Sequence, residues 1–180
     1  MEEQERQQLE AAACAPEVVA GDGFNPDATP PFGCSTGHKG QAMTAFTEFL
    51  RVVNTELHAK GMVRLESLLM PANFSSVVSE FMNTSIPRYC PTPARNTYHN
   101  GHPDLVPIDV YPNNAAQYAT DGIEVKASRY LSGWQGHNIK EGWLLVFVFD
   151  SNRPADLTRS VAPRPFHFVK VLGAELARED

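Results

Sequence analysis

Residues 121–150 read DGIEVKASRYLSGWQGHNIKEGWLLVFVFD and contain the two most strand-like segments of the chain. The Asp-Gly pair at 121–122 is a turn signal, and residues 123–128 alternate between apolar and polar side chains as in a half-buried strand. Residues 143–149 are apolar without interruption, which is typical of a strand buried on both faces. The two segments predict neighbouring parts of a β-sheet.

Helices and further strands are expected on both sides of this stretch. Apolar residues recur at three- and four-residue spacing over residues 41–60 and again over 74–82, which predicts two amphipathic helices. Three prolines within residues 86–101 exclude a helix there and indicate a long loop or an edge segment. Strands are expected over 104–111 and 166–172. The mixture of elements predicts an α/β protein.

The composition is that of one globular domain with an acidic N-terminal arm. The chain has 180 residues, is 42% hydrophobic and carries a net charge of −6. Residues 1–40 contain seven acidic and two basic residues together with many glycines and prolines. We expect residues 1–40 to be a flexible or irregular arm and residues 41–180 to be the folded domain. Deletion of the arm is then expected to leave the melting temperature nearly unchanged.

The cysteines and the N-terminus indicate the compartment. Cys14, Cys34 and Cys90 show no CxxC spacing, so a disulfide framework or a zinc ribbon is not expected. The first residues are acidic where a secretory signal needs positive charge. No run approaches the roughly 18 apolar residues of a membrane span. We expect a cytoplasmic protein that does not cross a membrane.

Two carboxylates and one lysine have the spacing that metal-assisted hydrolysis needs. Glu124 and Lys126 share one face of the predicted strand because alternate side chains point the same way, whereas Val125 points into the apolar layer. Asp104 stands 20 residues before Glu124, at the start of the preceding strand. Mg²⁺ prefers oxygen ligands and is commonly held by one or two carboxylates. A neighbouring ammonium can orient the nucleophile and offset developing charge.

The segments GHPDLVP and GIEVKAS resemble the PD-(D/E)xK signature of the restriction-endonuclease-like nuclease superfamily through Pro103, Asp104, Glu124, Val125 and Lys126. The resemblance implies a restriction-endonuclease-like core, which is a central mixed β-sheet flanked by α-helices. It places the two acids on adjacent strands and the lysine beside the second acid.

The resemblance also implies a metal-dependent endonuclease that hydrolyses phosphodiester bonds in DNA. Asp104 and Glu124 would hold Mg²⁺, or Mn²⁺ in its place, with help from the Val125 carbonyl, and Lys126 would position the attacking water. In this superfamily an upstream helix can donate a further carboxylate, for which Glu80 is the candidate. A homodimer would suit duplex DNA because two sites related by a twofold axis can cut both strands.

The polar and aromatic segment after the lysine, SRYLSGWQGHNIKEGW, is expected to lie beside the active centre. An indole can stack on an unpaired base, and amide or imidazole groups can contact phosphates or base edges. The alternative is a structural loop whose tryptophan covers the core. The candidates for substrate binding are Arg129, Trp134, Gln135, His137 and Asn138.

Two alternatives remain open. The first is a noncatalytic nucleic-acid-binding or assembly module with the same fold, which a salt-bridged or solvent-inaccessible acidic site would favour. The second is a zinc site, because His99 and His102 are three residues apart and Cys90 and His137 are further possible ligands. No second close pair completes a tetrahedral set, and the complete acidic pair with its lysine favours the nuclease.

Overall fold

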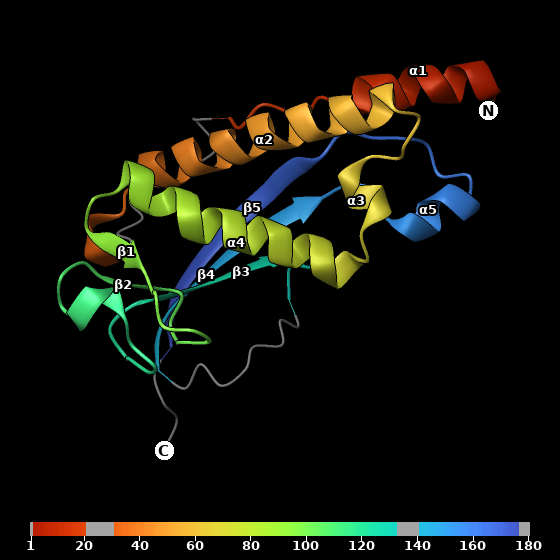
Figure 1. Ribbon diagram of the computed structural model, residues 1–180. Helices are drawn as coiled ribbons and strands as arrows, with labels where there is room; N and C mark the ends of the chain where they lie inside the picture. The colour runs from red at the N-terminus through yellow and green to blue at the C-terminus, as the bar shows by residue number, and fades with distance from the viewer. Residues whose placement is uncertain (1, 21–30, 133–140, 177–180) are drawn as a thin grey trace.

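The computed structural model describes residues 2–20, 31–132 and 141–176. Its strands form one sheet in the order β1 (Pro93–Arg95), β2 (Leu105–Pro107), β3 (Ile123–Ser128), β4 (Gly142–Asp150) and β5 (His167–Leu176) (Figure 1). Strands β3 and β4 pair in parallel, and the other neighbours pair antiparallel. The α/β class and the mixed sheet flanked by helices are thereby confirmed.

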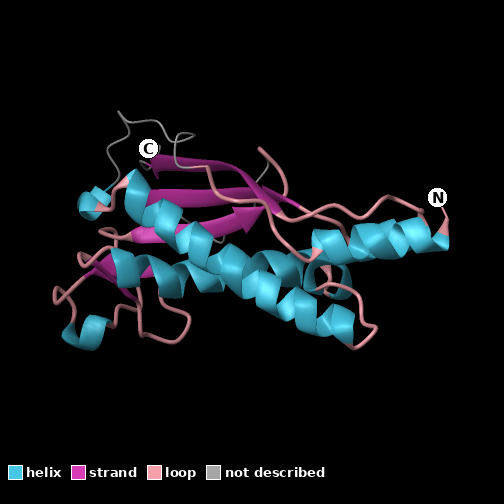
Figure 2. Cartoon of the chain, turned by 90° about the horizontal axis from the view of Figure 1, so that it is seen from above, coloured by secondary structure: helices cyan, strands magenta, loops and turns pink. Residues whose placement is uncertain are grey.

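Two long helices cover one face of this sheet (Figure 2). Phe46 and Leu50 of the first and Phe74 of the second pack with Val125 and Phe147 of the central strands, and all five side chains are almost fully buried. Burial of large side chains is the main favourable term in folding. The helices are α1 (Glu3–Ala13), α2 (Thr36–Ala59), α3 (Leu65–Leu68), α4 (Pro71–Tyr89) and α5 (Pro154–Thr158), with short 3₁₀ turns η2 (Pro31–Gly33) and η3 (Pro112–Asn114).

Helix α4 continues past the end expected from the sequence. It includes Pro87 in its last turn, although the prolines of residues 86–101 were expected to exclude a helix. A proline inside a helix removes a hydrogen bond and costs about 3 kcal/mol. Met82 and Ile86 are fully buried in the same turns, and their packing offsets that cost. The expected strand over 104–111 is likewise shortened to the three residues of β2.

Helices occupy parts of the N-terminal segment that the sequence predicted to be a flexible or irregular arm. Helix α1 occupies the first of them, and α2 begins at Thr36 rather than at residue 41. Ser35 caps α2 because its hydroxyl accepts the His38 N–H while its own N–H donates to the His38 ring. Ala13 and Cys14 are buried. Residues 2–20 and 31–40 therefore supply part of the fold.

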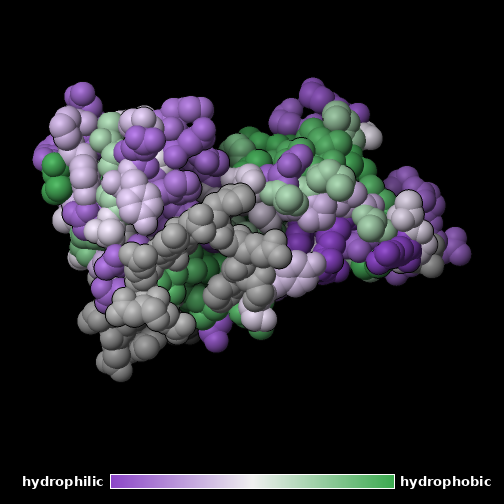
Figure 3. All heavy atoms as spheres, turned by 90° about the horizontal axis from the view of Figure 1, so that it is seen from below, coloured by the Kyte–Doolittle hydropathy of each residue, from purple (hydrophilic) through white to green (hydrophobic). Residues whose placement is uncertain are grey.

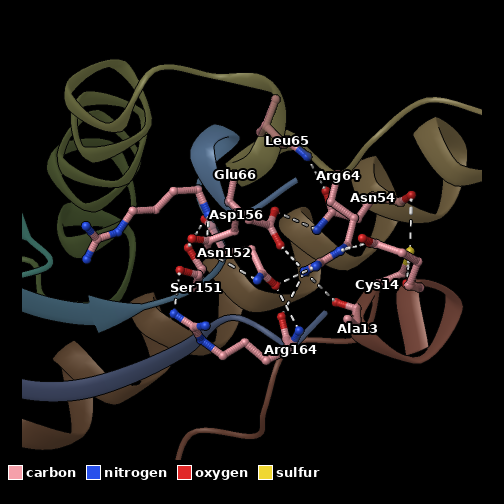
Figure 4. A network of polar contacts seen from close by, with 12 residues as sticks. Ala13, Cys14, Asn54, Arg64, Leu65, Glu66, Ser151, Asn152, Asp156 and Arg164 are labelled. Atoms are coloured by element: carbon pink, nitrogen blue, oxygen red, sulfur yellow. Dashed lines mark hydrogen bonds and ion pairs between the residues drawn. The ribbon is translucent and has the colours of Figure 1, made fainter. Parts of the chain in front are cut away.

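A buried arginine fastens α1 to the rest of the protein (Figure 4). Arg64 is 1% exposed, and its guanidinium donates to Glu10 at 2.8 Å, to Glu66 at 2.6 Å and to Asn152 at 2.8 Å. It also donates to the carbonyl of Ala13, at the end of α1. Buried charges need such partners because an unpaired one is costly. The network joins α1, α3 and the segment between β4 and α5.

None of the helices in the described part of the chain combines the length and the apolar character that a membrane crossing needs.

Candidate functional site

Asp104 and Glu124 lie opposite each other where β2 meets β3. Leu105 pairs with Ile123 in the antiparallel ladder, so the residue before Leu105 faces the residue after Ile123. The charge of Glu124 also acts on Asp104, since it is one of the causes that raise the pKa of Asp104. The structure thus brings together the two carboxylates that the sequence placed on adjacent strands.

The Asp104 carboxylate accepts the backbone N–H of Val125 at 2.9 Å. Burial and, next to it, the Glu124 carboxylate raise the pKa of Asp104 to about 6, although the Val125 N–H and the Lys126 ammonium act to lower it. Two carboxylates in one partly desolvated place repel each other. This is the electrostatic setting in which a cation binds favourably.

Glu124 is almost fully buried and has a basic group at each oxygen. Lys126 Nζ lies 2.5 Å from Glu124 Oε1, and His102 Nδ1 lies 3.5 Å from Oε2. Glu124 is 2% exposed, whereas the Lys126 and His102 side chains are 32% and 46% exposed. Val125 is buried in the core between them, which confirms the expected alternation along β3. The site therefore has a buried acid and a solvent-facing rim of basic groups.

A small pocket opens beside Glu124. Its volume is about 20 Å³, which is room for about one water-sized group. His102, Gly122 and Trp143 line it together with a further carboxylate, Glu141. Glu141 was not predicted as a site residue, because its only signal in the sequence is its position just before β4, which pairs in parallel with β3.

The surface around this region is uneven in character. Figure 3 shows hydrophilic side chains on the side where the segments around β1 and β2 lie in Figure 1. A hydrophobic area lies on the side of α3 and the first turns of α4, where Leu68 and Met70 are 46% and 65% exposed. The hydrophilic side is the one that carries the segment leading into Asp104.

Glu80 lies at the rim of the acidic pair. It projects from α4, is 61% exposed, and pairs with Arg95 of β1 at 2.7 Å. Its charge contributes only the smallest of the causes that raise the pKa of Asp104. Arg95, which sequence reasoning did not single out, is 53% exposed and adds a cation to this rim.

The segment before Asp104 is held by one side chain that sequence reasoning also missed. Asn96 donates to the carbonyls of Pro103 and Ala116, at 2.9 and 2.7 Å, and accepts the N–H groups of Tyr98 and Ala116. A single amide thus uses both its donors and its acceptor to bind three parts of the chain. Asparagine was visible in the sequence, but nothing local indicated its partners.

Gly122 permits the close approach of β3 to the Pro103-Asp104 segment. A Cβ at Gly122 would stand 2.2 Å from Pro103 Cγ and 2.4 Å from the Leu105 carbonyl oxygen. No side chain fits that space. The glycine that the sequence marked only as a turn residue therefore sets the distance between the two strands that carry the acids.

Arg129 was expected to bind substrate, and the structure gives it a different position. Its guanidinium donates to the carbonyl and hydroxyl of Ser151, at 2.8 and 2.7 Å, and to the Asn152 carbonyl. It also lies over the rings of Phe74 and Phe149. The side chain is thus engaged inside the protein beyond the end of β3. The structure does not bring it to the acidic pair.

The remaining substrate-binding candidates lie outside the described residues. Trp134, Gln135, His137 and Asn138 all fall within residues 133–140.

Among the described residues, Cys90, His99 and His102, which the sequence offered as an alternative zinc site, do not form one metal-ligating group. Cys90 groups instead with Cys34 and His38, whose ligand atoms all lie within 4.8 Å of one another. His99 is exposed, His102 lies beside Glu124, and His137 is outside the described residues. The sequence could not show the actual grouping, because Cys34 and Cys90 are 56 residues apart.

Comparisons with protein-family models, with curated proteins and with solved structures found no match.

Proposed function

We propose that this protein is a Mg²⁺-dependent endonuclease that hydrolyses phosphodiester bonds in DNA. The observation that supports it best is the electrostatic contact between Asp104, just before β2, and Glu124 of β3. Lys126 lies next to Glu124 on the same strand. The same residues carry the resemblance to the PD-(D/E)xK signature. Position in the fold and residue type thus agree.

The donor set fits a hard divalent cation. Two carboxylates offer the oxygen ligands that Mg²⁺ prefers, and Mn²⁺ accepts the same ligands. The Val125 carbonyl lies on the same side of β3 as its N–H, which donates to Asp104. It is therefore available as a third oxygen. Because burial and Glu124 raise the pKa of Asp104, a cation would relieve the repulsion between the acids.

Each residue of the site would have a separate role in hydrolysis. A bound cation would polarise the phosphoryl oxygen and lower the pKa of a water. Asp104 and Glu124 would hold that cation. The Lys126 ammonium, one-third exposed beside Glu124, would orient the attacking water and offset the charge that develops on phosphorus oxygens. The exposed imidazole of His102 is placed to hydrogen-bond a phosphate at the rim.

Duplex DNA is the proposed substrate, and a homodimer the proposed active form. Two strands of opposite direction are related by twofold axes, so two sites in a C₂ dimer can each cut one strand. A monomer with one site would have to release the DNA and bind it again to cut the second strand. Nicked intermediates that accumulate at low protein concentration would support this arrangement.

A noncatalytic nucleic-acid-binding module is the second candidate. The observation that favours it is the ion pair between Lys126 and Glu124 at 2.5 Å, with Glu124 only 2% exposed. A closed ion pair can serve structure alone. Among the described residues, however, Asp104 has no basic partner of its own, and a bound cation would better explain its half-buried carboxylate.

The two candidates are separated by cleavage and metal-binding assays on one set of variants. Supercoiled plasmid, linear duplex, single-stranded DNA and RNA are incubated with the protein in Mg²⁺, Mn²⁺ or EDTA. Asp104→Asn and Glu124→Gln remove one ligand charge each with little change in shape. Asp109→Asn is the matched control, since this exposed aspartate lies just beyond β2.

The nuclease requires metal-dependent cleavage that both site variants lose and the control retains. Isothermal titration with Mn²⁺ should show the same pattern for binding. Nucleic-acid binding without divalent-ion binding or cleavage of any substrate would instead establish the module.

A further inference from the structure

We propose a second metal site, formed by Cys34, His38 and Cys90, that takes Zn²⁺ or a metal of similar softness. The ligand atoms of the three residues all lie within 4.8 Å of one another. They come from the residue before the N-cap of α2, from its first turn, and from the C-cap of α4. Figure 1 shows the start of α2 near the end of α4.

The spacing is close to that of a zinc site. Zn–S bonds of about 2.3 Å and Zn–N bonds of about 2.0 Å, at tetrahedral angles, place ligand atoms about 3.5–3.8 Å apart. From separations of at most 4.8 Å, the side chains would have to move by about 1 Å or less. Rotation about side-chain bonds is sufficient for that.

The chemistry of the ligands selects a soft or borderline metal. Two thiolates and an imidazole favour Zn²⁺, whereas Mg²⁺ prefers oxygen. The thiolate of Cys34, which precedes the N-cap of α2, would gain from the positive end of that helix dipole. The ammonium of Lys39, which is 4% exposed, donates to the Cys34 carbonyl at 2.8 Å and adds positive charge beside the sulfurs. This site is thus chemically distinct from the Asp104 pair.

Burial protects two ligands and leaves the third accessible. Cys34 and Cys90 are each 1% exposed and belong to the hydrophobic core, whereas His38 is half-buried. No fourth histidine, cysteine or carboxylate joins the group among the described residues. Three protein ligands with one open position is the arrangement of zinc sites that keep a water. The metal would join the start of α2 to the end of α4.

Metal binding would change the cap of α2 in a defined way. The His38 Nδ1 atom accepts the Ser35 N–H at 3.2 Å. A neutral imidazole has one lone pair, so the ring cannot ligate a metal and also accept this hydrogen bond. The other half of the cap, from the His38 N–H to the Ser35 hydroxyl, is unaffected. Metal binding should therefore break the hydrogen bond from the Ser35 N–H to the His38 ring, and NMR can detect that loss.

The test uses the full chain, reduced and stripped of metal with a chelator. Zn²⁺ affinity is measured by competition with a chromophoric chelator, and Co²⁺ is added as a probe for thiolate-to-metal charge-transfer bands. Cys34→Ser, Cys90→Ser and His38→Gln remove one ligand each. Cys14→Ser is the matched control, because Cys14 is also buried but its sulfur bonds to the Glu10 and Asn54 carbonyls, away from the proposed site.

We expect one Zn²⁺ per chain, and cysteine variants that bind it at least about 100-fold more weakly. Cys14→Ser should bind within about twofold of the wild type. Zn²⁺ should raise the melting temperature of the wild type and of Cys14→Ser only, and histidine NMR should show His38 losing its bond to Ser35. Circular dichroism at low temperature shows whether each variant is folded.

Three outcomes would overturn the proposal. The first is folded, reduced protein that binds no Zn²⁺. The second is binding that survives in both Cys34→Ser and Cys90→Ser. The third is a disulfide between Cys34 and Cys90 that forms in air, together with a reduced protein on which Zn²⁺ has no effect. That result would make the cysteine pair a redox-active site. None of these outcomes depends on nuclease activity, so the acidic site is tested separately.

Discussion

The Asp104 carboxylate bonds to the backbone N–H of Val125 at 2.9 Å, at the point where the β2–β3 ladder stops. The N–H of Val125 in β3 thus donates to a side chain and not to a main-chain carbonyl of β2. The bond fixes the orientation of Asp104 towards Glu124, and it holds one carboxylate in a partly buried position. An ionised carboxylate in this position is disfavoured by burial and by the charge of Glu124. Measurements of the free energy of unfolding and of metal affinity can both detect this effect.

Stability in metal-free buffer should fall as the pH rises through the pKa of Asp104. Burial, aided by Glu124, raises this pKa from 3.8 to about 6 in the folded protein. The folded state therefore holds a proton that the unfolded state releases between about pH 4 and 6. The contribution of Asp104 is fully present below about pH 4 and is lost above about pH 6. Its upper limit is about 3 kcal/mol, at 1.36 kcal/mol for each pKa unit.

Urea unfolding in EDTA from pH 4.5 to pH 8 measures this contribution as the difference between wild type and Asp104→Asn. We expect the free energy of unfolding of Asp104→Asn to increase relative to that of the wild type as the pH rises. Parallel profiles would mean that Asp104 has an ordinary pKa. In buffer without EDTA, Mg²⁺ should stabilise the wild type most at high pH, where the Asp104 carboxylate is ionised. It should have little effect on the stability of Asp104→Asn.

Lys126→Ala and Asp104→Ala should have separable effects. Loss of the ammonium removes an interaction with the nucleophile and the transition state, so cleavage should fall about 100- to 1,000-fold. Mn²⁺ binding should persist, because both carboxylates remain. Asp104→Ala should instead weaken Mn²⁺ binding itself. Single-turnover cleavage and calorimetric titration give the two readouts, and Lys170→Ala on the exposed part of β5 is the control.

If Lys126→Ala loses metal binding to the same degree as Asp104→Ala, the lysine holds the site together and has no separate role in chemistry.

Much of the sheet and the acidic pair could be predicted because their signals are local. The alternation of residues 123–128 and the apolar run of 143–149 are readable within a few residues, and both form strands. The face shared by Glu124 and Lys126 follows from strand geometry alone. The position of Asp104 at the start of a neighbouring strand needed only the order of elements.

The groups that were missed depend on contacts between distant residues. Arg64 meets Glu10 and Asn152, which are 54 and 88 residues away, so no window of sequence contains the network. The acidic composition of residues 1–40 suggested an irregular arm because the partner of Glu10 was not visible. The Cys34 and Cys90 pair was missed for the same reason. Tertiary packing also decided the length of α4 against the local preference of Pro87.

Gly122→Ala should disturb the acidic pair and destabilise the fold. The new methyl group would collide with Pro103 and with the Leu105 carbonyl, and overpacking of this kind costs about 1–3 kcal/mol. Separation of β2 from β3 should also weaken Mn²⁺ binding by moving Asp104 away from Glu124. Chemical unfolding and metal titration measure the two effects.

Gly37→Ala is the control for that substitution. Among the described residues outside the backbone of α2, a Cβ there would meet Ser35 Oγ alone, at 3.6 Å. Alanine is favoured over glycine in a helix by about 1 kcal/mol. The control should be neutral or more stable. A Gly122→Ala variant with unchanged stability and metal affinity would show that the two strands adjust without loss.

Deletion of residues 1–14 should lower the melting temperature, in contrast to the expectation from sequence. The deletion removes the charged hydrogen bond from Arg64 to Glu10, the Ala13 carbonyl that Arg64 also contacts, and the buried Ala13 side chain. Charged hydrogen bonds contribute about 1.5–3 kcal/mol each. A total loss of about 2–4 kcal/mol corresponds to roughly 5–10 °C for a domain of this size.

Point variants separate the contact from the deletion. Glu10→Gln should reproduce part of the loss, because Arg64 stays buried with one anionic partner fewer. Glu5→Gln, an exposed position on the same helix, should leave the melting temperature within about 1 °C. Equal melting temperatures for the full chain, the deletion and Glu10→Gln would show that α1 contributes nothing to stability, as its acidic composition first suggested.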